Sequence, residues 1–421
     1  MKKEQRIQRR DSIIDASVFI LLLVIAAAVT LTLFYRQATS TVEELYHSDV
    51  KAYILEMMGT DSGYSFPYPV FFRFAAFLHL FTEPEMAVAL AVMLLNSGAM
   101  VLFKLLLNHY TLKPLAESMP GHSWLAGVLV SLVSISVFFT SMLFPPEGMY
   151  LPGIRFRYVG VFSGNPFHNA TYMAARPFAL LSFFQYARLL TNYEEGYGGR
   201  WKHSDKGVDL RDYLLFSVFL LLTTMTKPSF TIVLVGAAGL IMVYRMVRSK
   251  FRNFLPTIQL GLCFVPTFID LLYQYQGVFM PDEGVEGGVG FCFGEIWSLY
   301  CDSIPLAICL AVGFPLAVLV LNYKELKSNT LYRFSWQIYG MGFGMAFLLY
   351  EKGFRRPDFN FSWGYMYGIF FAFVGALLVL LQATARRKRP LLLGAQWLLY
   401  LWHVACGIYY FIGIFGGADY Y

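Results

Sequence analysis

Apolar stretches long enough to cross a lipid bilayer follow one another along most of this chain. A spanning helix needs about 20 mostly apolar residues. Eleven windows of that kind occur, near residues 13–34, 86–107, 124–143, 172–190, 212–226, 229–247, 254–275, 303–322, 334–350, 364–384 and 391–414. The first window is too long, and too polar beyond its end, for a cleaved signal peptide. The pattern predicts an all-α, polytopic membrane protein with about eleven transmembrane helices in a single domain, residues 1–421.

Composition agrees with a membrane location and excludes several soluble classes. Of the 421 residues, 57% are hydrophobic and 14% are charged, and the mean hydropathy is +0.53. An ordinary soluble domain is about 45–50% apolar and about 25% charged. A soluble enzyme, a disordered chain and a nucleic-acid-binding domain are therefore excluded.

The basic residues predict the orientation of the chain. Lysines and arginines gather before the first window and in four loops, and all of these clusters fall on one side when eleven spans are threaded in order. The positive-inside rule places that side, and the N-terminus, in the cytoplasm, with the C-terminus outside. The net charge of +6 is thus mainly a topology signal. The loop clusters are Arg200, Lys202, Lys206 and Arg211; Arg245, Arg248, Lys250 and Arg252; Lys324, Lys327 and Arg333; and Arg386, Arg387, Lys388 and Arg389.

The first outer loop, residues 35–85, carries most of the candidate chemistry. Residues 41–58 alternate loosely between apolar and charged side chains, as an interfacial helix does. Gly59 to Pro69 then interrupts the helix, and residues 70–81 are apolar but too short to span. The loop therefore predicts two helices at the outer membrane surface, with Asp49 near the exit of the first span.

Two motifs resemble those of GT-C superfamily glycosyltransferases. Asp49-x-x-x-Tyr53, followed by ILEMMG and FPYPVFFRFAAFLHLF, is similar to the first outer loop of the aminoarabinose transferase and protein O-mannosyltransferase type. Met225-Thr226-Lys227-Pro228-Ser229 is similar to the Thr-Lys-Gly-Pro turn of those enzymes. Val50 stands where the family often has a second acid, and the usual glycine of the turn is missing. The resemblance covers roughly residues 1–250; beyond them only hydropathy and topology agree.

The resemblance implies an inverting enzyme that transfers a sugar from a polyprenyl-phosphate or polyprenyl-pyrophosphate donor. The acceptor is then a glycan, lipid or protein at the extracytoplasmic face. Asp49 is the predicted general base, because a carboxylate must take the proton of the acceptor. The departing lipid phosphate needs cationic donors. The predicted phosphate ligands are Lys227, Arg355, Arg356, Arg155, Arg157 and Arg176, and the predicted substrate-binding residues are Tyr53, His168 and Asn165.

Several of these residues also have a structural interpretation. Asp49 fits a solvated position on an interfacial helix, and Lys227 fits an interface anchor. Arg176 lies inside a predicted span, where a functional role and snorkelling to the interface both remain open. A polar cap at the entrance of the fourth span would account for His168, Asn165 and Asn169. The other acids of the first loop are interpreted as exposed charges: Glu43, Glu44, Glu56 and Asp61.

The sequence contains no metal-ligand set. No second acid stands beside Asp49, and no His/Glu pair has helical ligand spacing. Dependence on a divalent cation such as Mg²⁺ or Mn²⁺ stays open, and no nucleotide cofactor is expected because the cytoplasmic loops lack a P-loop pattern. Cys292 and Cys301 share an outer loop, where a disulfide and two free thiols are both open. The acids that a metal site would draw from other loops are Glu147, Asp282, Glu283, Glu286 and Asp358.

Two other functions compete with glycosyl transfer. A transporter or flippase of lipid-linked saccharides would show internal repeats, and none is evident. A membrane acyltransferase would use His403, but this histidine has no neighbouring acid in the sequence. All three functions place the protein in the bilayer.

Overall fold

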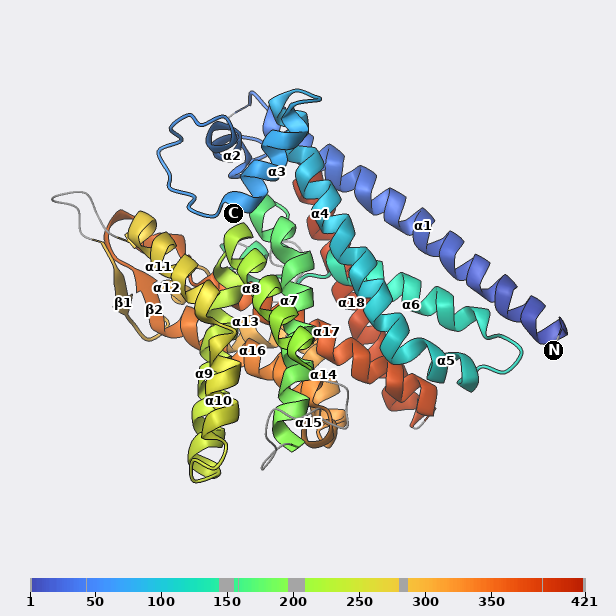
Figure 1. Ribbon diagram of the computed structural model, residues 1–421. Helices are drawn as coiled ribbons and strands as arrows, with labels where there is room; N and C mark the ends of the chain where they lie inside the picture. Colours follow the sequence, from blue (N-terminus) through green and yellow to red (C-terminus); the bar gives the residue numbers. More distant parts are fainter. Residues whose placement is uncertain are drawn as a thin grey trace.

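The computed structural model describes residues 2–42, 44–143, 155–157, 159–195, 209–279, 287–387 and 389–418. It is mostly helical, at 77% (Figure 1), which confirms the predicted helical class. Five of the described helices are long and apolar enough to cross a membrane, or up to seven spans exist if each of two bent helix pairs counts as one. The protein is therefore a multi-pass membrane protein.

Each of the eleven predicted windows contains helix, but only some of these helices are long and apolar enough to cross a membrane. Those that qualify lie in α1 (Lys2–Thr39), α4 (Pro84–Leu107), α9 (Ser229–Arg248), α17 (Ser362–Arg386) and α18 (Pro390–Phe415). The bent pairs are α10 (Phe254–Leu262) with α11 (Val265–Phe279), at 53°, and α13 (Ile304–Ala311) with α14 (Gly313–Leu321), at 75°. The remaining four are shorter or more polar: α6 (Trp124–Ser136), α7 (Ala170–Glu195), α8 (Leu210–Thr226) and α16 (Thr330–Leu348).

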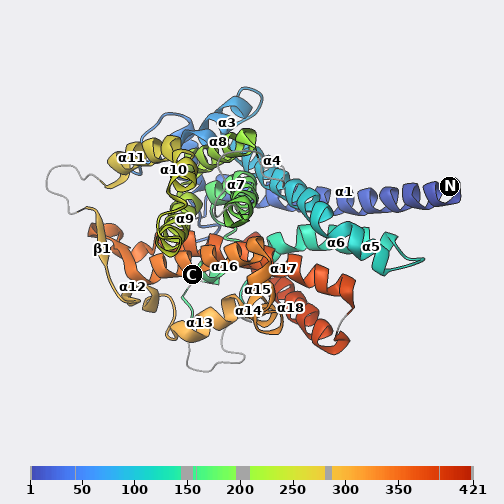
Figure 2. The same ribbon diagram turned by 60° about the horizontal axis from the view of Figure 1, so that its bottom comes forward.

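Helix α17 forms the centre of the core. Every residue from Gly364 to Leu381 is buried, as expected of a helix that is apolar on all sides. Its neighbour α16 approaches very closely, because a Cβ atom on Gly342 would lie 2.7 Å from the carbonyl oxygen of Gly364. Such close backbone contacts at small residues are the usual packing mode of membrane helices. Helices α7, α8 and α9 lie on one side of α16, and α13 and α14 on the other (Figure 2).

The N-terminus lies at the free tip of α1, and the C-terminal end of the described chain lies near the other end of that helix (Figure 1). The end of α18 packs beside the end of α1, where Arg36 Nη1 donates to the carbonyl oxygen of Phe415 at 2.9 Å. The backbone N–H of Tyr46 donates to the carbonyl oxygen of Gly417 at 3.3 Å. The C-terminal end of the described chain thus reaches the first predicted outer loop.

The first loop contains two short helices, α2 (Val50–Met57) and α3 (Pro69–His79), as the sequence predicts, but the first begins at Val50 and not near residue 41. A two-stranded antiparallel sheet, which the sequence does not predict, pairs β1 (Val289–Phe291) with β2 (Leu349–Glu351). A 3₁₀ helix, η4 (Gly353–Asp358), follows β2. The short connecting helices are α5 (Lys113–Ser118), α12 (Glu295–Ser298) and α15 (Glu325–Ser328).

Candidate active site

Asp49 directly precedes α2, and two donors hold its carboxylate. Residues four apart share one face of a helix, so the phenol of Tyr53 reaches back and donates to Asp49 Oδ2 at 3.1 Å. Asn169 Nδ2 donates to the same oxygen at 2.7 Å. Asp49 is only partly buried. The carboxylate therefore has a fixed orientation and access to the outside.

Asn169 occupies the N-cap of α7 and connects this helix to Asp49. Its Oδ1 accepts the backbone N–H of Tyr172 at 2.9 Å, the usual bond of an asparagine cap. The amide nitrogen is thereby turned toward Asp49 and toward the Tyr53 hydroxyl, which is 3.0 Å away. Thr171 Oγ1 donates to Asn169 Oδ1 at 3.0 Å and lies 3.2 Å from the Tyr53 hydroxyl. The start of α7 and the start of α2 thus form one hydrogen-bond network.

Lys227 joins this network from the turn between α8 and α9. The residue before a proline is biased to extended backbone, and Lys227 is extended before Pro228, with φ −164°. Its Nζ donates to Thr171 Oγ1 at 3.3 Å and lies 4.6 Å from the ring centroid of Trp363. Burial lowers the pKa of Lys227 to about 8, with Asp49 opposing the shift and Arg355 adding to it.

Lys227 and Arg355 line one cavity of about 350 Å³. Glu351 Oε2 lies 3.4 Å from Arg355 Nε and accepts a hydrogen bond from Asn360 Nδ2 at 2.6 Å. Burial raises the pKa of Glu351, while Arg355 and Asn360 oppose that shift. The cavity therefore combines two cations with one carboxylate that positions Arg355. Its other lining residues include Tyr64, Ser65, Phe66, Pro67, Tyr68, Gln274 and Trp363.

Three of the predicted phosphate ligands lie elsewhere on the surface. Arg356 Nη2 donates to Glu295 at 2.6 Å, because successive residues of the η4 turn point in different directions. Arg155 pairs with Asp302 at 3.5 Å, and its side chain is 89% exposed. Arg157 is also exposed, and its guanidinium lies 5.6 Å from the ring centroid of Tyr300. None of the three lines the cavity formed by the described residues.

Arg176 and Asn165 lie inside the protein. The Arg176 side chain is fully buried, so snorkelling to the interface is wrong for it. Its Nη1 donates to Asn96 Oδ1 at 3.0 Å, and its Nη2 donates to Asn165 Oδ1 at 2.7 Å and to the carbonyl oxygen of Gly164 at 2.9 Å. Asn165 Nδ2 in turn donates to the carbonyl oxygen of Thr140 at 2.7 Å. Both residues hold the segment before α7 in place.

Replacing Arg176 with methionine should lower the free energy of unfolding by about 3–5 kcal/mol, because three buried acceptors lose a charged donor. Thermal unfolding of the purified protein in detergent measures this loss. Arg188, on the same helix, is the matched control: its side chain is 50% exposed and pairs with Asp212 at 3.4 Å. Arg188→Met should cost under about 1 kcal/mol. Equal losses in the two variants would contradict the structural role of Arg176.

His168 lies beside the site but is uncharged at neutral pH. It is buried, and its ring centroid lies 5.6 Å from that of Trp363. Burial lowers the pKa of His168 to about 3, with a further contribution from the charge of Lys227. A neutral imidazole in this position suits packing or hydrogen bonding to a substrate and does not add charge for a phosphate.

Sequence reasoning missed several residues of the site. From the sequence, Asn169 is interpreted only as part of a helix entrance, and Thr171 is assigned no role. Two polar side chains two residues apart at a span boundary are the signal that could have found them. Glu351 stands four residues before Arg355, a spacing typical of an ion pair. Asn360 gave no sequence signal.

The remaining candidates concern metals, thiols and His403. Among the residues that the structure describes, no three His, Cys, Asp or Glu side chains form a group that could hold a metal ion. Cys292 and Cys301 are free, buried thiols. His403 Nδ1 lies 2.6 Å from the carbonyl oxygen of Ser141, and its Nε2 accepts the backbone N–H of Phe314 at 3.1 Å, so both ring nitrogens are engaged. Predicted residues outside the described part are Glu43, Glu147, Arg200, Lys202, Lys206, Asp282, Glu283, Glu286 and Lys388.

Comparison with known proteins gives no relative. The chain matches no family model, no curated protein and no solved structure.

Proposed function

We propose that this protein is a membrane glycosyltransferase of the GT-C type, which moves a sugar from a polyprenyl-phosphate or polyprenyl-pyrophosphate donor to an extracytoplasmic glycan, lipid or protein. One observation carries the proposal. The carboxylate of Asp49 and the ammonium of Lys227 are joined through Tyr53 and Thr171, beside a cavity that Lys227 and Arg355 line. A base and two cations within one small region are what transfer from a lipid phosphate requires.

In the proposed reaction, the acceptor hydroxyl or amine attacks the anomeric carbon and gives its proton to Asp49. The bond between that carbon and the phosphate oxygen breaks, and its electron pair stays on the lipid phosphate. Lys227 and Arg355 stabilise this developing charge. Tyr53 and Asn169 both bind Oδ2 of Asp49, so among the described contacts Oδ1 is left to take the proton.

The proposal includes eleven spans, with the N-terminus in the cytoplasm and the site outside. An odd number of crossings is supported by the contact of Phe415 with Arg36, because Arg36 lies near the end of α1 that is away from the N-terminus. The basic clusters also gather: Arg386 Nη1 donates to Glu325 at 2.6 Å, which joins the loop after α17 to α15. Asp49 and the C-terminal end of the described chain share the other end, through the bond between Tyr46 and Gly417. This arrangement follows the positive-inside rule.

Purified protein in vesicles, supplied with a polyprenyl-phosphate sugar labelled in the sugar, tests the function. Release of free polyprenyl phosphate with labelled acceptor supports transfer. Movement of the intact donor between leaflets, without cleavage of the sugar–phosphate bond, would instead establish the transporter or flippase. Consumption of an acyl donor would establish the acyltransferase, which the engaged nitrogens of His403 disfavour.

Two neighbouring arginines test the phosphate site. Arg355→Gln should weaken donor binding by about tenfold or more, because it removes one of the two cations from the cavity. Arg356→Gln should leave donor binding unchanged, because Arg356 pairs with Glu295 at the surface. Binding of the labelled donor to purified protein measures both. The phosphate site is misplaced if the Arg356 variant loses affinity and the Arg355 variant keeps it.

A further inference from the structure

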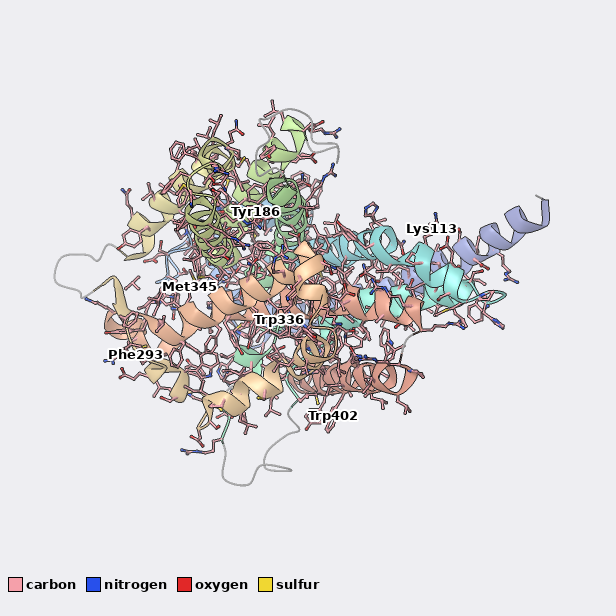
Figure 3. The ribbon with its side chains drawn as sticks, turned by 90° about the horizontal axis from the view of Figure 1, so that it is seen from below. Lys113, Tyr186, Phe293, Trp336, Met345 and Trp402 are labelled. Carbon is pink, nitrogen blue, oxygen red and sulfur yellow. The ribbon has the colours of Figure 1, made fainter. Side chains whose placement is uncertain are left out.

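A second, larger cavity of about 1820 Å³ lies between α9 and α16, and we refer to it as the α9–α16 groove. The residues that line it recur every three or four positions on each helix, so each helix presents one face to the groove. Those on α9 are Ala237, Leu240, Ile241, Tyr244, Arg245 and Arg248, and those on α16 are Arg333, Trp336, Gln337, Gly340, Met341, Gly344, Met345 and Leu348. Trp336 and Met345 show the course of α16 in Figure 3.

Two glycines on α16 make the groove deep. A Cβ atom on Gly340 or on Gly344 would meet no other atom within 4 Å. Nearer the outer end, Gly236 of α9 closes the space, because a Cβ atom there would lie 2.9 Å from the side chains of Met341 and Met345. The two helices are therefore in contact at one end and leave an unfilled channel along the rest of their length.

The sides of the groove are apolar and exposed, as they would be against lipid. Leu240 is 65% exposed and Tyr244 is 60% exposed, although both lie on a helix apolar enough to span. The outer end of the groove is also apolar and is formed by Phe291, Leu348 and Leu349. A water-soluble ligand would gain little along such a surface, whereas acyl chains would fill it.

The other end of the groove is strongly basic. Six cations line it, and no acidic residue does so in the described part of the chain. The nearest acid on α15, Glu325, is already paired with Arg386 at 2.6 Å. Basic pockets between membrane helices bind the head groups of anionic lipids. The six cations are Arg245, Arg248, Lys250, Arg252, Lys327 and Arg333.

We propose that the α9–α16 groove is a binding site for an anionic phospholipid. The phosphate lies among the cations of the basic end, and the acyl chains lie along Gly340 and Gly344. A zwitterionic phospholipid is disfavoured, because its own cationic group would face six like charges, and no acid of the described residues lines this end of the groove. The site is separate from the proposed active-site cavity, apart from Met345, which lines both, and the proposal does not depend on glycosyl transfer.

Fluorescence quenching of Trp336 tests this site in the full-length protein. The protein is placed in phosphatidylcholine vesicles in which a rising fraction of the lipid is replaced by dibrominated phosphatidylglycerol or dibrominated phosphatidylcholine. Subtracting the signal of Trp336→Phe isolates Trp336. We expect the anionic lipid to half-quench Trp336 at a fraction about fivefold lower, or more, than the fraction of phosphatidylcholine that is needed. A factor of about five is what one basic residue contributes near such a surface. Equal quenching by the two lipids would overturn the proposal.

Matched variants locate the effect. Replacing Arg248, Arg252 and Lys327 together with glutamine should reduce the preference for the anionic lipid, because it halves the number of cations at the basic end. Arg387→Gln with Arg389→Gln should preserve the preference. Gly340→Leu and Gly344→Leu should reduce quenching by both lipids, because a Cβ atom at either position meets no other atom within 4 Å and the rest of the side chain would occupy the groove. Gly239→Leu, at an equally open position of α9 outside the groove, should leave quenching unchanged. An unchanged preference in the triple glutamine variant would also overturn the proposal.

Discussion

Asp49→Asn is expected to slow sugar transfer by about 10²–10⁴-fold, the usual contribution of a positioned general base. The amide keeps the shape of the carboxylate, and its oxygen can still accept hydrogen bonds from Tyr53 and Asn169. It cannot take a proton from the acceptor. Donor binding should therefore be unchanged while turnover is lost, which single-turnover kinetics with labelled donor would separate.

Two further variants make the test of Asp49 specific. Asp61 is an exposed acid of the same loop whose Oδ1 accepts the backbone N–H of Gly63 at 2.8 Å, so Asp61→Asn should leave turnover unchanged. Glu351 is the carboxylate that lines the proposed cavity. If Glu351→Gln stops transfer and Asp49→Asn does not, Glu351 is the base and the assignment of Asp49 is wrong.

Lys227→Met is expected to lower kcat/KM for the donor by about 10²–10³-fold, as the loss of one donor to a developing anion does. The Lys227 side chain is buried and its ammonium faces Trp363, so no bulk water replaces the lost charge. The matched control is Lys352→Met, because Lys352 is an exposed cation three residues before Arg355. Normal kinetics in Lys227→Met, or equal losses in both variants, would remove Lys227 from the phosphate site.

The pH dependence of donor binding tests the same residue. Burial lowers the pKa of Lys227 to about 8 from its ordinary 10.5, so its charge is lost as the pH rises through 8. Donor affinity should fall above that pH, and Lys227→Arg should remove the fall because arginine stays charged. The sign for stability is the reverse: the buried charge destabilises the fold fully below about pH 8, and the penalty disappears as the pH rises toward 10.5. An affinity that is flat up to pH 10 would contradict the assignment.

The positions of the helices could be predicted from the sequence. Which of them are long and straight enough to cross the membrane could not. Hydropathy locates α10 and α11 as one window, yet the backbone bends by 53° between Leu262 and Val265. A hydropathy window records composition and contains no information on direction. The pairing of β1 with β2 was also missed, because three-residue strands separated by 57 residues, from Phe291 to Leu349, leave no local periodicity.

Contacts of the site between residues close in sequence could be predicted, whereas contacts between residues far apart in sequence could not. Asp49 and Tyr53 could be paired from sequence, since a spacing of four places them on one helical face. The contact of Lys227 with Thr171, 56 residues away, depends on how α7 and α8 pack. Arg355 and Arg356 are indistinguishable as a sequence pattern. Only the turn of η4 directs the first toward the cavity and the second toward Glu295.

The contact between α18 and the first loop makes the segment before Asp49 depend on a part of the chain that is synthesised late. Pro390–Phe415 is the last helix in chain order, and Gly417 accepts the N–H of Tyr46, three residues before Asp49. Arg36 is likewise held by Phe415. During synthesis the segment before Asp49 therefore lacks these two contacts until α18 has left the ribosome. If Asp49 is the base that we propose, a partly inserted chain would not yet hold it in place, and it would act on a lipid donor only after α18 is inserted.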